Sequence, residues 1–142
     1  MFFIIGGAYQ GKLDHAIETY NLKESDIFTC KKIDSDSCGS TAKSEASGSA
    51  PEIDFSCRCI DGIEEFTYAC IRNGIEPLDY FKEHEAEWQD SILICDDLFC
   101  GVVPLGAELR EWRQASGRLC KYLSQQAQQV SRIFCGLEQR LK

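Results

Sequence analysis

A chain of 142 residues with 44% hydrophobic residues is long enough for one domain that buries about two-thirds of its unfolded surface. Its net charge of −8 at pH 7 argues against general binding to nucleic acids or to anionic membranes. The charge is uneven, because residues 1–100 contain 8 basic and 20 acidic side chains, whereas residues 101–142 contain 7 and 3. The basic C-terminal part leaves room for a small anionic ligand.

The N-terminal segment FFIIGGAYQGKL, residues 2–13, has the pattern of a buried strand followed by a phosphate-binding loop. Phe2 to Ile5 form an apolar run that is typical of a central strand in a parallel sheet. Gly6, four further residues, Gly11 and Lys12 reproduce the spacing G-x-x-x-x-G-K of a P-loop. Glycines let backbone N–H groups face a phosphate, and the start of the following helix adds its dipole.

We therefore expect this loop to bind the phosphates of a nucleotide, with Lys12 as a catalytic residue at the β- and γ-phosphates. The expected binding residues are Gly6, Gly7, Ala8, Tyr9, Gln10, Gly11, Lys12 and Leu13. Leu13 stands where a P-loop usually has the Ser or Thr hydroxyl that binds Mg²⁺, so the metal would lack one protein ligand. The alternative is that Lys12 is merely the first residue of a helix after a glycine-rich turn.

The middle of the chain is predicted to alternate between helices and strands. We expect a helix from Lys12 to Tyr20, a strand at 26–30, a strand at 53–60, a helix at 60–71 and a helix at 77–88. Residues 34–52 are rich in Ser, Gly, Ala and Asp without a hydrophobic period, which predicts a mobile loop or insertion.

Ser91 to Cys95 form a predicted buried strand that is followed by Asp96 and Asp97. An apolar strand followed by an acid is the Walker-B arrangement, in which a carboxylate holds Mg²⁺ directly or through water. We expect Asp97 to be a catalytic residue and the metal ligand, and Asp96 to be less involved. The alternative is a strand-end turn with solvated carboxylates.

The C-terminal part predicts a long helix from about Gly106 to Gln129, a strand at 130–135 and a short tail to Lys142. The expected core stripe of the helix is Leu109, Trp112, Ser116, Leu119, Leu123 and Ala127. Another face contains Arg110, Arg113, Gly117 and Lys121, and we interpret it as a solvated surface. The order of elements indicates one α/β domain over residues 1–142, a three-layer fold whose mainly parallel sheet binds ligands at its C-terminal strand ends.

The chain contains nine cysteines, an odd number, and no secretory signal precedes them, so we expect reduced thiols in a cytoplasmic protein. The spacings of Cys57 and Cys59 and of Cys95 and Cys100 do not match a zinc pair well. No segment approaches the roughly 18 apolar residues of a membrane span.

Several charged or titratable side chains are predicted to be surface features rather than an acid/base pair. We interpret them as exposed helix residues: Glu64, Glu65, Glu83, Glu85, Glu87 and His84. The other histidine, His15, lies on the first predicted helix.

The segment from Asp96 to Lys142 contains a strand end, the sequence G-V-V-P, a helix with R-x-x-x-x-x-x-G-R, and a last strand followed by Gly. It resembles the end of the adenosylcobinamide kinase / adenosylcobinamide-phosphate guanylyltransferase family, as a short and divergent member. The matching residues are Gly101, Val102, Val103, Pro104, Arg110, Gly117, Arg118, Gly136 and Lys142. The N-terminal Gly6-Gly7-Ala8 and Gly11-Lys12 are similar to the family motif G-G-A-R-S-G-K-S, and together the two blocks cover a little under half of the chain.

The resemblance implies a P-loop NTPase with a RecA-like sheet that acts in cobalamin biosynthesis. Members phosphorylate adenosylcobinamide with a nucleoside triphosphate and then transfer GMP from GTP to that phosphate through a guanylylated histidine. The implied ligands are GTP or ATP, Mg²⁺, and adenosylcobinamide or its phosphate. We also expect a homo-oligomer.

The chain departs from the family at several motif positions. Leu13 replaces the Mg²⁺-binding Ser, Asp96-Asp97 stand where Asn-Glu is usual, and Phe99 replaces a glycine. The family's nucleotide-accepting histidine lies after the second strand, where this chain has the segment 34–52 without any histidine. Two alternatives stay open: a kinase with at most weak guanylyl transfer, and a non-catalytic nucleotide-binding or subunit-interaction protein. The position of Arg118 suits either a subunit contact or a phosphate.

Overall fold

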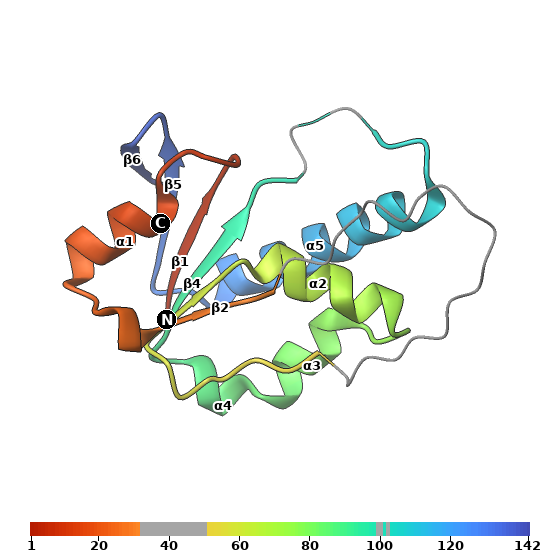
Figure 1. Ribbon diagram of the computed structural model, residues 1–142, viewed down its shortest axis with the longest axis horizontal. Coiled ribbons are helices and arrows are strands. Elements are labelled where there is room, and N and C mark those ends of the chain that lie inside the picture. Colours follow the sequence, from red (N-terminus) through yellow and green to blue (C-terminus); the bar gives the residue numbers. More distant parts are fainter. Residues whose placement is uncertain (32–50, 99–100, 102) are drawn as a thin grey trace.

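Strands and helices alternate along the chain in a computed structural model, which describes residues 1–31, 51–98, 101 and 103–142 (Figure 1). The strands are β1 (Phe2–Gly6), β2 (Ile27–Thr29), β3 (Cys59–Asp61), β4 (Ile92–Asp96), β5 (Gln129–Phe134) and β6 (Leu137–Arg140). The helices are α1 (Lys12–Tyr20), α2 (Ile63–Arg72), α3 (Pro77–Glu83), α4 (Glu85–Trp88) and α5 (Ala107–Gln126), with a short 3-10 turn, η1, at Glu24–Asp26. The predicted insertion at 34–52 lies outside the described residues, except for its last two positions.

The strands form one sheet in the order β2-β3-β4-β1-β5-β6. The first five are parallel, and only β6 runs antiparallel to its neighbour β5. The apolar run of β1 lies at the centre, where Ile4 pairs with Ile94 of β4 and with Ser131 of β5. The prediction of a mainly parallel α/β sheet is therefore confirmed. In the same register Gly6 lies beside Asp96, so the N-terminal loop begins next to the end of β4.

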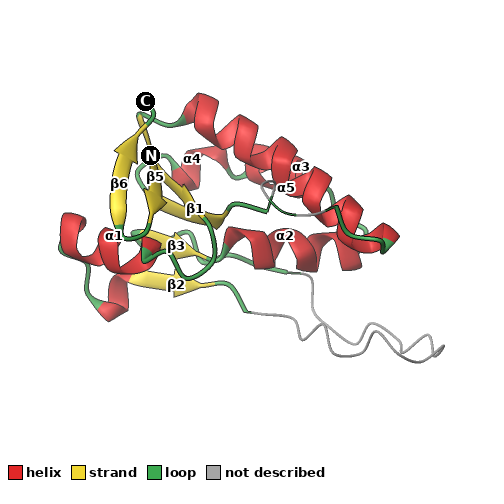
Figure 2. Cartoon of the chain, turned by 90° about the horizontal axis from the view of Figure 1, so that it is seen from above, coloured by secondary structure: helices red, strands yellow, loops and turns green. Residues whose placement is uncertain are grey.

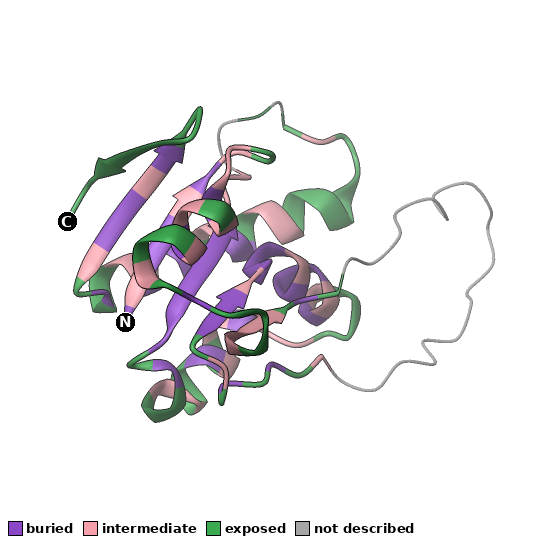
Figure 3. Ribbon diagram, turned by 60° about the vertical axis from the view of Figure 1, so that its left-hand side comes forward, coloured by how far each residue is buried: buried purple, intermediate pink, exposed green. Residues whose placement is uncertain are grey.

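Two apolar layers cover the two faces of the sheet, because neighbouring side chains of a strand point to opposite faces. Phe3 and Leu93 pack with the buried residues of α2, α3 and α5, among them Phe66, Phe81 and Leu119. On the other face Ile4, Ile94 and Ile133 pack with α1 and with Leu22. Figure 2 shows α1 on one side of the sheet and the other long helices opposite, and Figure 3 shows the buried central strands between them.

The region around the third strand and third helix differs from the prediction. Only Cys59–Asp61 pair as a strand, whereas the preceding residues form a loop whose Phe55 packs on Tyr80 and Phe81. The predicted helix at 77–88 is divided into α3 and α4 at His84, whose backbone leaves the helical conformation. The imidazole nitrogen Nδ1 of His84 lies 2.8 Å from the carbonyl oxygen of Tyr80 at this break.

The C-terminal part also differs at its boundaries. α5 ends at Gln126, three residues before the predicted end, because Ala127 is extended and buried under the sheet. The predicted tail contains β6, which follows a tight turn in which Cys135 (φ 51°) and Gly136 (φ 76°) are both left-handed. Two successive left-handed residues are the requirement of the type I′ turn that best joins antiparallel strands.

The predicted stripe of α5 is correct in its C-terminal half, where Ser116, Leu119 and Leu123 are buried. Leu109 is wrong as a core residue, because it is 36% exposed and all of residues 107–111 lie outside the core. Arg118 forms an ion pair with Glu76 at 2.8 Å. Among the helices that the structure describes, none is both long and apolar enough to cross a membrane.

Candidate active site at the β1–α1 loop

The loop between β1 and α1 is shaped by three backbone features. Gly6 passes so close to the carbonyl oxygen of Ile133 in β5 that a Cβ at this position would overlap with that oxygen. Tyr9 (φ 60°) and Gly11 (φ 80°) both adopt left-handed conformations and turn the chain into α1. Gly11 is the N-cap of α1, and its carbonyl oxygen accepts the N–H of His15.

The same loop is joined to the turn between β5 and β6. The side-chain oxygen Oε1 of Gln10 accepts the N–H of Cys135 at 2.5 Å, and its backbone oxygen accepts the N–H of Gly136 at 3.2 Å. Residues at opposite ends of the chain thus fix the loop's outer side.

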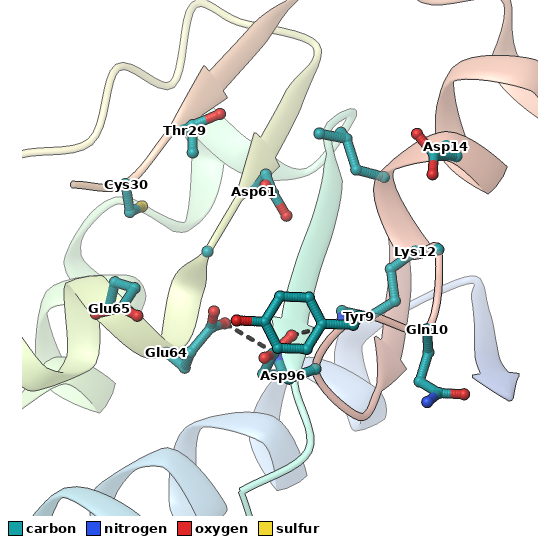
Figure 4. A pocket seen from close by; sticks show the side chains of 14 residues that line it. Tyr9, Gln10, Lys12, Asp14, Thr29, Cys30, Asp61, Glu64, Glu65 and Asp96 are labelled. Atoms are coloured by element: carbon teal, nitrogen blue, oxygen red, sulfur yellow. Dashed lines mark hydrogen bonds and ion pairs between the residues drawn. The ribbon is translucent and has the colours of Figure 1, made fainter. Parts of the chain in front are cut away.

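Lys12 turns its side chain back over the loop instead of pointing to solvent. Its Nζ donates to the carbonyl oxygen of Gly7 at 2.9 Å and lies 2.5 Å from Oδ1 of Asp96 (Figure 4). Only 8% of the side chain is exposed, although it is charged. The two oxygen partners compensate the ammonium group for its removal from water and hold it over the loop.

A pocket of about 280 Å³ opens beside this lysine at the C-terminal ends of the parallel strands. It is lined by Ala8, Tyr9, Gln10, Gly11, Lys12, Leu13, Asp14, Thr29, Cys30, Asp61, Gly62, Glu64, Glu65 and Asp96. Six of the eight predicted phosphate-binding residues therefore line one cavity. Of the other two, Gly6 sets the approach to β5, and Gly7 provides the carbonyl oxygen that Lys12 contacts.

The two acidic residues at the end of β4 lie in different places. Asp96 lines the pocket and contacts Lys12. The N–H of Asp97 donates to the carbonyl oxygen of Gly6 at 2.8 Å. The side chain of Asp97 is only 11% exposed, and its Oδ2 lies 3.9 Å from the guanidinium of Arg132. Asp97, the predicted catalytic and metal-binding residue, is not among the pocket-lining residues; its neighbour Asp96 occupies that position.

Glu64 is a pocket residue that the sequence-based prediction missed. It was expected to be exposed, and this is wrong: it is 8% exposed, and its Oε2 accepts the N–H of Asp96 at 2.8 Å. Burial raises the pKa of the Glu64 carboxyl to about 7, and the negative charges of Asp96 and Asp61 add to this increase. The hydrogen bond from the backbone N–H of Asp96 lowers the pKa but does not offset the effect of burial. Glu65 also lines the pocket and is half-buried, whereas Glu83 and Glu87 are exposed as predicted.

A sequence signal for this missed acidic group was present. Asp61 follows the predicted strand at 53–60 just as Asp96 follows the predicted strand SILIC, so both acids stand at the end of a predicted strand. Because β3 and β4 are parallel neighbours, their carboxyl ends meet at one edge of the sheet. Gly62 (φ 78°) then starts α2 at once and places Glu64 in its first turn.

Neither described histidine belongs to the pocket lining. His15 on α1 has its Nε2 3.7 Å from a carboxylate oxygen of Glu138 in β6. The ring of His84 stacks on Tyr80, with the ring centroids 4.3 Å apart.

The seven cysteines in the described part of the chain are free thiols. Burial raises the pKa of Cys30, Cys59 and Cys70 to about 12, so these thiols keep their protons at neutral pH. Cys95 and Cys120 lie with their sulfur atoms 3.6 Å apart in the core. Across the described ranges, no three His, Cys, Asp or Glu side chains are grouped as a metal site would need.

The residues that stand at the magnesium-binding positions of the two motifs do not form a magnesium site. Leu13 packs against the apolar layer of α1 and offers no hydroxyl, Asp96 contacts Lys12, and Asp97 lies against Arg132.

Comparison with protein-family models and with curated proteins gives no match to this chain.

Proposed function

We propose that the chain binds a nucleoside triphosphate, GTP or ATP, in the pocket of the β1–α1 loop and transfers its terminal phosphoryl group to adenosylcobinamide. The proposal assigns it to the P-loop adenosylcobinamide kinase / guanylyltransferase family, with a RecA-like sheet. One observation favours this most strongly, namely that Lys12 lies under the loop with its Nζ between Gly7 and Asp96. A phosphate in the loop would replace the carbonyl oxygen of Gly7 as a partner of this ammonium.

The topology supports a ligand at this position. The chain leaves the central strand β1, crosses to the edge strand β2 through α1, and then returns through β3 and β4 to lie next to β1. α1 packs on one face of the sheet, and α2, α3 and α5 pack on the other. The connection from β1 through α1 and the connection from β4 through α5 therefore lead in opposite directions from two neighbouring strands. In open α/β sheets, ligands bind where such connections diverge, outside the carboxyl ends of the strands.

Two observations favour a second candidate, a nucleotide-binding protein without catalysis. Leu13 provides no metal-binding hydroxyl, and neither described histidine lines the pocket to receive GMP. In both candidates the compartment proposed is the cytoplasm, because the described cysteines are free. The expected homo-oligomer stays a prediction.

Calorimetric titration with GTP and with ATP, each with and without Mg²⁺, separates the candidates when it is combined with an assay of phosphoryl transfer to adenosylcobinamide. The kinase requires binding of at least one nucleotide and formation of adenosylcobinamide phosphate. Binding that is independent of Mg²⁺, with no transfer, would instead identify the non-catalytic protein. Absence of nucleotide binding in every titration would refute both.

A further inference from the structure

Glu64 is held firmly at the wall of the pocket. Its Oε2 accepts the N–H of Asp96 at 2.8 Å, and its backbone oxygen accepts the indole N–H of Trp112 from α5 at 2.8 Å. The ring of Trp112 is in turn packed on Tyr68 of α2, with centroids 4.8 Å apart. A residue of β4 therefore holds the carboxylate of Glu64, and a residue of α5 holds its backbone. Catalysis requires a reacting group to be held in position in this way.

Asp96 connects this carboxylate to Lys12. The carboxylate of Asp96 lies 2.5 Å from Nζ of Lys12, and the backbone nitrogen of Asp96 lies 2.8 Å from Oε2 of Glu64 (Figure 4). If Lys12 contacts the β- and γ-phosphates, Asp96 is the residue that stands between Glu64 and the ammonium group of Lys12. An acceptor that enters this pocket would meet Glu64 on the wall opposite the loop (Figure 4).

We propose that Glu64 accepts the proton of the acceptor hydroxyl during phosphoryl transfer, an inference that rests on the proposed function. In this step the acceptor oxygen forms a bond to the terminal phosphorus, and the bond from that phosphorus to the bridging oxygen breaks. The electron pair of the broken bond leaves with the nucleoside diphosphate. The proton of the hydroxyl moves to the carboxylate of Glu64, which releases it to water after the product departs.

The surroundings of Glu64 suit this role. Asp61 from β3, Asp96 from β4, Glu65 from its own helix and the thiols of Cys30 and Cys95 are the acidic groups around it, and Lys12 is the nearby cation. Burial, first of all, brings the pKa of Glu64 to about 7, so that the carboxylate is both available and basic near neutral pH. Asp96 is less suited to accept a proton, because its carboxylate is paired with Lys12.

The test is kcat as a function of pH between about pH 5.5 and 8.5, with GTP or ATP and adenosylcobinamide at saturation, for the wild type and three variants. Glu64→Gln keeps the size of the side chain and an oxygen for the N–H of Asp96 but cannot take the proton. We expect it to lower kcat by about 10²–10⁴-fold and to abolish the rise of kcat through pH 7. Glu64→Asp should retain that rise with an intermediate kcat, and Glu83→Gln, a control at an exposed residue of α3 outside the pocket lining, should resemble the wild type.

The nucleotide Kd, measured by calorimetry for each variant, should stay within about threefold of the wild type, which shows that the pocket is intact. Transfer by the wild type with an unchanged kcat and pH profile in Glu64→Gln would overturn the role of Glu64 alone. Nucleotide binding without any transfer by the wild type would overturn the proposed kinase, and this inference with it.

Discussion

Lys12 and Asp96 form an ion pair of 2.5 Å between the first turn of α1 and the end of β4, 84 positions apart in the chain. The pair compensates two charges that are largely removed from water. It also prepares an ammonium group at the start of a helix, where phosphate is favoured.

Replacement of this lysine tests phosphate binding directly. Lys12→Ala should weaken binding of GTP or ATP by about 1–3 kcal/mol, because a charged hydrogen-bond donor is lost. The measurement is calorimetric titration, with Lys121→Ala as the control, since Lys121 is an exposed residue of α5. Equal affinities of the two variants would contradict a P-loop role for Lys12.

The buried carboxyl of Glu64 predicts a pH dependence of stability. Its pKa is about 7 in the folded protein against an ordinary value of 4.5, so between these values the folded state holds a proton that the unfolded chain has released. The free energy of unfolding therefore falls as pH rises from about 4.5 through about 7, and levels off above. Relative to Glu64→Gln, the wild type should lose on the order of 2–3 kcal/mol across this window in urea unfolding. Parallel pH curves for the two proteins would show that the carboxyl titrates normally.

The glycines at the start of the loop should differ in their tolerance of a methyl group. Gly6→Ala should destabilise the fold by about 1–3 kcal/mol, because its Cβ would overlap with the carbonyl oxygen of Ile133. Gly7→Ala is the matched control, since its Cβ would meet nothing nearer than the side chain of Gln10 at 3.5 Å. Thermal unfolding of both variants measures the difference, and similar midpoints would mean that β5 moves away from Gly6 without cost.

The positions of the histidines predict that no GMP becomes attached to the protein. His15 on α1 lies next to Glu138 of β6, and the ring of His84 stacks on Tyr80. Neither histidine lines the pocket. Incubation with GTP labelled at the α-phosphate should leave the denatured protein unlabelled. An acid-labile label that disappears in His15→Ala or His84→Ala would assign the transfer to that histidine.

The sequence was sufficient where structure depends on local patterns. The apolar run of β1, the glycine spacing after it and the strand before Asp96 are local signals, and each of these elements forms close to its predicted position. The sequence also predicted that the loop after β1 and the end of β4 lie at the same edge of the sheet. Strands that alternate with helices are parallel, so their carboxyl ends point the same way.

The features that the sequence did not reveal depend on long-range partners. Glu64 has the charge of a surface helix residue, but its carboxylate is buried beside the N–H of Asp96, a partner 32 positions away in the chain. Successive side chains of a strand point to opposite faces, so only one of Asp96 and Asp97 can face the pocket. The sequence does not show which one, because the residue at which β4 ends cannot be predicted to within one position. β6 was missed because its four residues are all exposed and give no hydrophobic alternation.

The contacts of Gln10 with Cys135 and Gly136 have a consequence for the order of folding during synthesis. β1 leaves the ribosome before its partners β4 and β5, which are about 90 and 130 residues further along the chain. The nascent chain must therefore keep its apolar N-terminal strand and its glycine loop without partners while nearly the whole domain is translated. Exposed strands of this kind are where chaperones bind and aggregation begins, and the loop can take its final shape only once residues 129–140 have emerged.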